Sequence, residues 1–230
     1  VPRIYLDHNA STPVRSEVLD AMLPYFAEHF GNASSVHAFG QEARGALEEA
    51  RARVAALLNA SPAEIVFTSG GTESDNLGVI GGAHAMPMRG RHVIVSAIEH
   101  DAVRQAADHL EQTGFTVTRV PPDSRGVVSA EAVAAAIRPN TVLVSVMAAN
   151  NETGVIQPTA EIGDACAKRG VSFHVDAVQV AGKAPIDVKG WQATLATIAG
   201  HKFYAPKGVG ALYVKSGFKP MPLQFGGSHE

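Results

Sequence analysis

The sequence predicts an α/β fold: a mostly parallel sheet with helices on both faces. Two observations support this prediction. Short apolar runs rich in Val, Ile and Thr recur along the 230 residues, and runs of helical character separate most of them. This alternation is typical of parallel strands joined by helical crossovers. With 46% hydrophobic and 18% charged residues, the chain can bury the core of one large domain.

Seven strands are expected, at 64–69, 92–97, 115–120, 141–148, 171–177, 193–199 and 210–215. Helices are expected over 40–59, where apolar residues recur at helical spacing, and over 101–114 and 159–170, which both close on a glycine. Ligands bind beyond the carboxyl ends of the strands in such sheets. We therefore expect the functional residues in the loops that follow the strands.

Charge and cysteine content indicate which kinds of binding partner the sequence favours. Nineteen Lys and Arg against 22 Asp and Glu give a formal net charge of -3, which does not favour binding to nucleic acid or to an anionic membrane. Cys166 is the single cysteine, so an internal disulfide is excluded. No apolar stretch is long enough to span a bilayer. We expect a cytoplasmic protein whose partner is a small molecule or another protein.

The loop after the first expected strand is FTSGGTESDN, residues 67–76. It passes through two glycines into a helical run, so backbone N–H groups and the positive helix end converge there, as a phosphate requires. An ordinary helix N-cap is the alternative, because Thr72 and Asp75 have the three-residue spacing of a capping box.

A second candidate position is the strand end in FHVDAVQV, residues 173–180. His174 and Asp176 point to the same side of an extended strand, and an Asp there is a natural partner for a cationic ring nitrogen. A solvated carboxylate is the simpler alternative. A metal site is not favoured, because no two histidines have the spacing of a zinc helix and no H-x-H occurs.

The segment IAGHKFYAPKGVGALYV, residues 198–214, places Lys202 beside His201 and before a glycine-rich turn. Such a lysine either covers backbone carbonyls or offers an amine for covalent chemistry. Pyridoxal phosphate needs that amine, an acid for its ring nitrogen, a helix start for its phosphate and a flat group against its ring. His100 is a candidate for the flat group, although a histidine there more often caps a helix. Lys207 is expected to be a turn residue.

Seven segments form one collinear set along the chain: YLDHNASTPV, GNASSVHAFG, IVFTSGGTESDNLGVIG, EHDAV, NNETGVIQP, FHVDAVQVAGKAPIDV and GHKFYAPKGVGALYV. The set resembles the cysteine desulfurases, pyridoxal-phosphate enzymes of the class V aminotransferase group, and the match runs from residue 5 to residue 230. The resemblance implies the type I pyridoxal-phosphate fold and a homodimer with active sites near the subunit interface. It also implies conversion of L-cysteine to L-alanine, with sulfur passed to an enzyme cysteine as a persulfide for iron–sulfur clusters and other products.

The resemblance assigns roles around the cofactor ring. Lys202 would form the Schiff base and carry a proton between the substrate Cα and the cofactor. Asp176 would keep the ring nitrogen protonated, and Gln179 would hydrogen-bond the phenolate oxygen. His100 would stack on the ring and exchange protons with the substrate.

The resemblance also assigns the phosphate and substrate ends. Gly71, Thr72 and His201 would bind the phosphate. Asn151 would lie on the phenolate side near the substrate carboxylate. Two further positions in the N-terminal motifs would approach the substrate pocket, namely Asn9 and Asn32.

The chain departs from the family pattern in two ways. Ala199 stands where the family usually has a serine that helps hold the phosphate, so somewhat weaker cofactor binding is expected. The family pattern also continues beyond Glu230 with an arginine motif, a mobile cysteine loop and a small domain. We therefore expect an N-terminal segment at 1–15 that contributes to the substrate pocket, a cofactor-binding large domain at 16–230, and no C-terminal small domain.

The nucleophilic cysteine is the main missing part. Cys166 lies in a helical run between apolar neighbours and is expected to be structural, so the chain alone should not complete persulfide transfer. A selenocysteine lyase or another class V enzyme would use the same cofactor cradle. A non-catalytic scaffold for a sulfur-transfer partner is the alternative from another class, but a scaffold has no need for the five ring and phosphate positions together.

Overall fold

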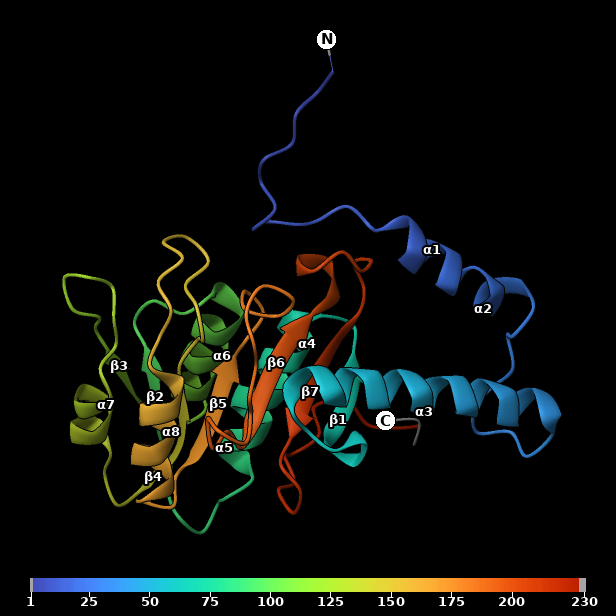
Figure 1. The fold of residues 1–230 in the computed structure, drawn as a ribbon. Coiled ribbons are helices and arrows are strands. Elements are labelled where there is room, and N and C mark those ends of the chain that lie inside the picture. Colours follow the sequence, from blue (N-terminus) through green and yellow to red (C-terminus); the bar gives the residue numbers. More distant parts are fainter. Residues whose placement is uncertain (1, 228–230) are drawn as a thin grey trace.

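The computed structural model describes residues 2–227 and is built on one seven-stranded sheet (Figure 1). The last residues of the match, 228–230, lie outside the described residues. All seven expected strands are confirmed, each one to three residues shorter than expected at one or both ends. They are β1 (Ile65–Thr68), β2 (His92–Ser96), β3 (Thr116–Val120), β4 (Thr141–Ser145), β5 (Ser172–Asp176), β6 (Leu195–Ala199) and β7 (Gly210–Val214).

The strand order across the sheet is β1-β7-β6-β5-β4-β2-β3, and the strands from β6 to β3 are parallel. The prediction of a mostly parallel sheet is therefore confirmed. The exception is β7, which is antiparallel to both β6 and β1. The connection from β6 to β7 holds only the short 3-10 helix η3 (Gly200–Lys202) and a turn, and so it returns the chain without a helical crossover.

Two apolar layers cover the sheet, one on each face. Alternate residues of each strand point to opposite faces. Ile94 and Val144 belong to one core cluster, while their strand neighbours Val93 and Leu143 belong to the other. The first cluster includes buried residues of α3 (Ala38–Leu58), α7 (Ala130–Ala136) and α8 (Thr159–Ala167), and the second includes those of α5 (Gly82–His84) and α6 (Asp101–Gln112).

The three expected long helices correspond to α3, α6 and α8, with bounds that differ by up to three residues. The helix after β1 is α4 (Gly71–Asn76), which continues into a π-helical turn, η2 (Leu77–Gly81). Gly78 lies in that turn, and a Cβ there would come within 2.6 Å of the His174 ring, so the close packing of these two residues requires a glycine. The remaining short helices are α1 (Ser16–Met22), α2 (Pro24–Ala27) and η1 (Pro62–Glu64).

The N-terminal segment follows a separate course. Figure 1 shows α1 and α2 lying apart from the sheet, at the same side as the long helix α3. The residues before α1 return to the sheet: Thr12 N–H donates to the His201 carbonyl at 2.8 Å, and Tyr204 N–H donates to Thr12 Oγ1 at 2.7 Å. Across residues 2–227, no helix combines the length and apolar character that crossing a membrane requires.

Candidate active site

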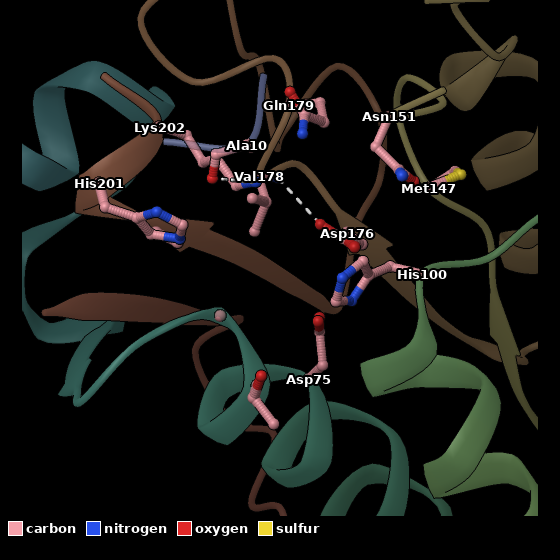
Figure 2. A pocket seen from close by; sticks show the side chains of 13 residues that line it. Ala10, Asp75, His100, Met147, Asn151, Asp176, Val178, Gln179, His201 and Lys202 are labelled. Carbon is pink, nitrogen blue, oxygen red and sulfur yellow. Dashed lines mark hydrogen bonds between the residues drawn. The ribbon is translucent and has the colours of Figure 1, made fainter. Parts of the chain in front are cut away.

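A cavity of about 340 Å³ lies beyond the carboxyl ends of the parallel strands (Figure 2). Its lining comes from the N-terminal segment and from the loops after β1, β2, β4, β5 and β6, where the functional residues were expected. The structure brings all eight positions expected for catalysis and cofactor binding to this one cavity. The lining residues are Ala10, Gly71, Thr72, Asp75, His100, Met147, Asn151, Asp176, Val178, Gln179, Ala199, His201 and Lys202.

Lys202 is held at the edge of the cavity by the N-terminal segment. Its Nζ donates to the carbonyl oxygens of Asn9 at 2.7 Å and Ala10 at 3.1 Å, so the ammonium covers two backbone carbonyls. Burial lowers the pKa of Lys202, and the negative charges of Asp176 and Asp7 oppose that shift. A lower pKa increases the fraction of neutral amine, which is the nucleophilic form.

Asp176 is the last residue of β5, and its side chain is buried. Val178 N–H donates to Asp176 Oδ1 at 2.9 Å. Burial raises the pKa of Asp176, whereas the Val178 N–H, His100 and Lys202 all favour the carboxylate. A buried carboxylate beside the Lys202 ammonium and a backbone N–H donor is suited to pairing with a positive ligand group.

Asp75 is a second buried acid that the sequence motif did not reveal. The alternative of a capping box formed by Thr72 and Asp75 is not borne out: Asp75 turns inward with 1% of its surface exposed, and Glu73 instead accepts from Ser69 N–H at 2.8 Å. In the described chain, Asp75 Oδ1 has no hydrogen-bond partner. Burial and the charge of Asp176 raise the pKa of Asp75 well above its ordinary value, which favours the neutral form of this acid.

His174 lies behind these two acids on the same strand as Asp176. Its Nδ1 is 2.8 Å from Ser145 Oγ, and its Nε2 is 3.1 Å from Thr197 Oγ1 and 3.6 Å from Asp75 Oδ1. Burial lowers the pKa of His174 to about 3, so the ring is neutral. The expectation that His174 and Asp176 face the same side is confirmed, because Asp75 interacts with both.

Glu99 is a third acid beside the cavity; the residue is half-buried, and its carboxyl group is buried. Its Oε1 accepts from Met147 N–H at 2.8 Å and from the Ser96 hydroxyl, while its Oε2 has no partner among residues 2–227. Burial raises the pKa of Glu99 to about 8. The motif EHDAV drew attention to the histidine, and nothing in the local pattern indicates that the preceding glutamate is buried.

His100 caps a helix and also lines the cavity. It is the N-cap of α6, and its Nδ1 accepts from Ala102 N–H at 3.1 Å. Because Nδ1 is the acceptor, the proton of the neutral ring is on Nε2. The ring also lines the cavity next to Asp176 (Figure 2).

The opposite end of the cavity is suited to an anion. Gly71 and Thr72 open α4 there, and His201 Nδ1 is buried without a hydrogen-bond partner in the described chain. A Cβ on Gly71 would lie 3.2 Å from Val178 Cγ2, so a glycine leaves room at the helix start. Ala199 is buried at this end and offers only a methyl group.

The four amide residues expected at the site do not all lie at the cavity. Gln179 Nε2 donates to the Asn9 carbonyl at 3.1 Å, and Asn151 Nδ2 donates to Glu152 Oε1 at 2.8 Å. Gln179 and Asn151 line the cavity, and Asn9 reaches its edge through its backbone. Asn32 is not brought to this cavity: it lies between α2 and α3, and its Oδ1 accepts from Ser34 N–H at 2.9 Å.

Cys166 is buried in α8, as expected of a structural cysteine. Burial raises the pKa of its thiol to about 12. Over the described range, no group of three or more His, Cys, Asp or Glu side chains is arranged to hold a metal ion.

A comparison with known protein families identifies the class of protein to which this chain belongs. The aminotransferase class-V family model matches residues 4–230, so the chain belongs to the aminotransferase class-V family. Class-V aminotransferases depend on pyridoxal 5′-phosphate.

Two proteins with high sequence identity to this chain are cysteine desulfurases. The cysteine desulfurase IscS of Anaeromyxobacter dehalogenans is 52% identical over 230 residues, covering 99% of this chain and 57% of that protein. The IscS of Dictyoglomus turgidum is 47% identical over 227 residues, covering 99% of this chain and 58% of that protein. This chain therefore spans less than two thirds of the length of these curated relatives.

Two solved structures share the fold over nearly the whole chain. A NifS-like protein superposes with a TM-score of 0.94 at 42% identity, covering 98% of this chain and 62% of that one. SspA in complex with cysteine gives a TM-score of 0.94 at 41% identity, covering 98% of this chain and 65% of that one.

Proposed function

We propose that this chain is the pyridoxal-phosphate-binding part of a cysteine desulfurase, which converts L-cysteine to L-alanine and passes the sulfur to a cysteine as a persulfide. The observation that supports this most strongly is that a lysine amine, a buried carboxylate and an unpartnered imidazole nitrogen meet in one cavity. The named relatives are cysteine desulfurases, and one structural neighbour was solved in complex with cysteine.

The residues present fit pyridoxal phosphate. The cavity volume of about 340 Å³ lies within the range of small-molecule sites. Lys202 supplies an amine for the aldehyde, and Asp176 supplies an acceptor for a protonated ring nitrogen. The unpartnered Nδ1 of His201 and the open helix start at Gly71 and Thr72 supply donors for a phosphate.

The surroundings of each of these side chains support a separate role for it in the proposed reaction. When bound, pyridoxal phosphate supplies a ring that withdraws electrons from the substrate Cα. Asp176 would accept a hydrogen bond from the protonated ring nitrogen, since the Val178 N–H and the charge of Lys202 favour its carboxylate form. Lys202 would take and return a proton at the substrate Cα, and burial, which lowers its pKa, favours the neutral amine that this requires. His100 presents its ring next to Asp176.

Persulfide transfer needs a thiol that Cys166 does not provide, because Cys166 is buried and its pKa is raised to about 12. We propose that a cysteine outside these 230 residues accepts the sulfur and passes it to an acceptor or iron–sulfur scaffold protein. A cytoplasmic homodimer, and a division into segment 1–15 and domain 16–230, belong to the same proposal.

Borohydride trapping tests the cofactor site. The purified chain is mixed with pyridoxal phosphate, its visible spectrum is recorded, and the reduced adduct is mapped by peptide mass spectrometry. We expect a yellow complex and an adduct on Lys202. Lys202→Ala should lose the visible band and the adduct, and Lys207→Ala, which removes an exposed turn lysine, should keep both.

The proposal fails if the wild-type chain takes up no cofactor, or if the adduct maps to another lysine. Desulfurase chemistry is tested separately by measuring L-alanine formed from L-cysteine in the presence of an added thiol acceptor. Alanine formation that is equal in the wild type and in Lys202→Ala would refute the assignment of that chemistry to this cavity.

A further inference from the structure

Lys183, a lysine outside the predicted site, contacts a residue that lines the cavity. The chain after β5 makes two overlapping turns, closed by Ala181 N–H donating to the Ala177 carbonyl at 3.1 Å and Ala184 N–H donating to the Val180 carbonyl at 3.0 Å. Gly182, with a φ of 72°, lies in the second turn and returns the chain so that Lys183 lies beside Gln179. Lys183 Nζ accordingly donates to Gln179 Oε1 at 2.8 Å.

This contact fixes the orientation of the Gln179 amide. A lysine ammonium has only donors, so the Gln179 group that faces Lys183 must be the carbonyl oxygen. The NH2 group then lies on the other side, where Nε2 donates to the Asn9 carbonyl at 3.1 Å. Figure 2 shows the Gln179 nitrogen on the cavity side and its oxygen directed away.

Without Lys183, the Asn9 carbonyl would be the one remaining hydrogen-bond partner of this amide among the described residues. The terminal torsion of glutamine has a broad, roughly two-fold preference, so the torsion itself does not select which end of the amide faces the cavity. The Asn9 carbonyl also accepts from Lys202 at 2.7 Å. Lys183 also reaches Asn9 Oδ1 at 3.4 Å, so it ties the N-terminal segment to the same amide.

We propose that Lys183 is a positioning residue that keeps the NH2 group of Gln179, rather than its oxygen, turned toward the cavity. The inference rests on the proposed function in one respect, namely that Gln179 meets the phenolate oxygen of the cofactor. An NH2 group donates to such an oxygen, whereas an amide oxygen would repel it. Lys183 would act through Gln179, since it is not among the described residues that line the cavity.

A double-mutant cycle tests whether Lys183 acts through Gln179. The dissociation constant for pyridoxal phosphate and the pH midpoint of the visible absorbance of the complex are measured for Lys183→Met, Gln179→Ala and the double variant. Lys183→Met should weaken binding by about 3- to 10-fold. It should also raise the pH midpoint, because a lost donor disfavours the ionised oxygen. In the Gln179→Ala background, Lys183→Met should change neither quantity.

Lys183→Arg is the matched control, since it keeps the charge and the donors and should retain both wild-type values. Additive effects of Lys183→Met and Gln179→Ala would overturn the proposal, because Lys183 would then act through its own charge near Lys202 or through the fold. The charge alternative has a physical basis: the charge of Lys202, together with burial, lowers the pKa of Lys183.

A second readout does not need the cofactor. The side-chain NH2 signals of Gln179 are followed by ¹⁵N NMR in the cofactor-free chain, where they should shift in Lys183→Met and keep their positions in Lys183→Arg. Unchanged signals in Lys183→Met would also overturn the proposal. If the wild-type chain bound no pyridoxal phosphate, the proposed function would fail, while the NMR result would still decide whether Lys183 orients Gln179.

Discussion

Replacing Glu99 by Gln should remove a large part of the pH dependence of stability. The Glu99 carboxyl is buried, accepts from Met147 N–H at 2.8 Å, and carries one oxygen without a partner in the described chain. Its folded-state pKa is about 8, against an ordinary value of 4.5. An isosteric amide keeps the carbonyl acceptor and never ionises, so the variant isolates the effect of the charge.

The sign and size of the effect follow from linkage. A folded pKa above the unfolded one means that the bound proton stabilises the fold fully below pH 4.5, progressively less as pH rises toward 8, and not at all above that. At about 1.4 kcal/mol per pH unit, the separation of these two values amounts to a loss on the order of 5 kcal/mol. Glu99→Gln should be no more stable than the wild type at pH 4.5, and more stable by that order above pH 8.

Urea denaturation at several pH values, followed by the fluorescence of the single tryptophan, Trp191, measures this difference. Acids that do not interact with Glu99 titrate alike in both proteins and cancel when the two free energies of unfolding are subtracted, whereas the charges of Asp75 and Asp176 are coupled to that of Glu99 and remain part of the measured difference. The exposed Glu28→Gln is the control and should follow the wild type at every pH. Wild-type and Glu99→Gln curves that stay parallel from pH 4.5 to pH 8 would refute the reasoning.

Three further predictions follow from the site and its packing. Ala199→Ser restores a hydroxyl at the phosphate end and should tighten pyridoxal phosphate binding by roughly 10-fold or more, as measured by absorbance titration; unchanged affinity would contradict it. Gly78→Ala places a methyl group 2.6 Å from the His174 ring and should lower the free energy of unfolding by about 1–3 kcal/mol. The matched control is Gly45→Ala, where the added methyl meets nothing within 4 Å, and equal losses in the two variants would count against the packing argument. The Cys166 thiol should resist iodoacetamide until the chain is unfolded, and rapid alkylation of the native protein would show that it is accessible.

Much of the fold could be predicted from the sequence because buried parallel strands are continuous apolar runs. The run from His92 to Ser96 is wholly buried and was recognisable for that reason. The helix α7 was missed because its seven residues are mostly alanine, which shows no apolar periodicity. The antiparallel direction of β7 was missed as well, since strand direction depends on the length of a connection rather than on strand composition.

The site residues were predictable where the chain itself places them, at the ends of strands. Asp176 and Lys202 are of this kind. The buried acids Asp75 and Glu99 were not, because their burial depends on elements distant in sequence: His174 lies beside Asp75, and Met147 donates to Glu99. Lys183 was missed for a related reason, since its contact with Gln179 forms only when residues 177–184 make two overlapping turns.

The position of β7 has a consequence for the order in which the chain assembles. β1 is an edge strand whose one sheet partner is β7, and β7 in turn separates it from β6. During synthesis, β1 therefore has no strand beside it until residues 210–214 have been made. The glycine-rich loop after β1 joins the sheet only then, with Gly210 packed closely against Gly70. A cofactor that binds this loop consequently meets it in its sheet-bound position only after β7 has entered the sheet.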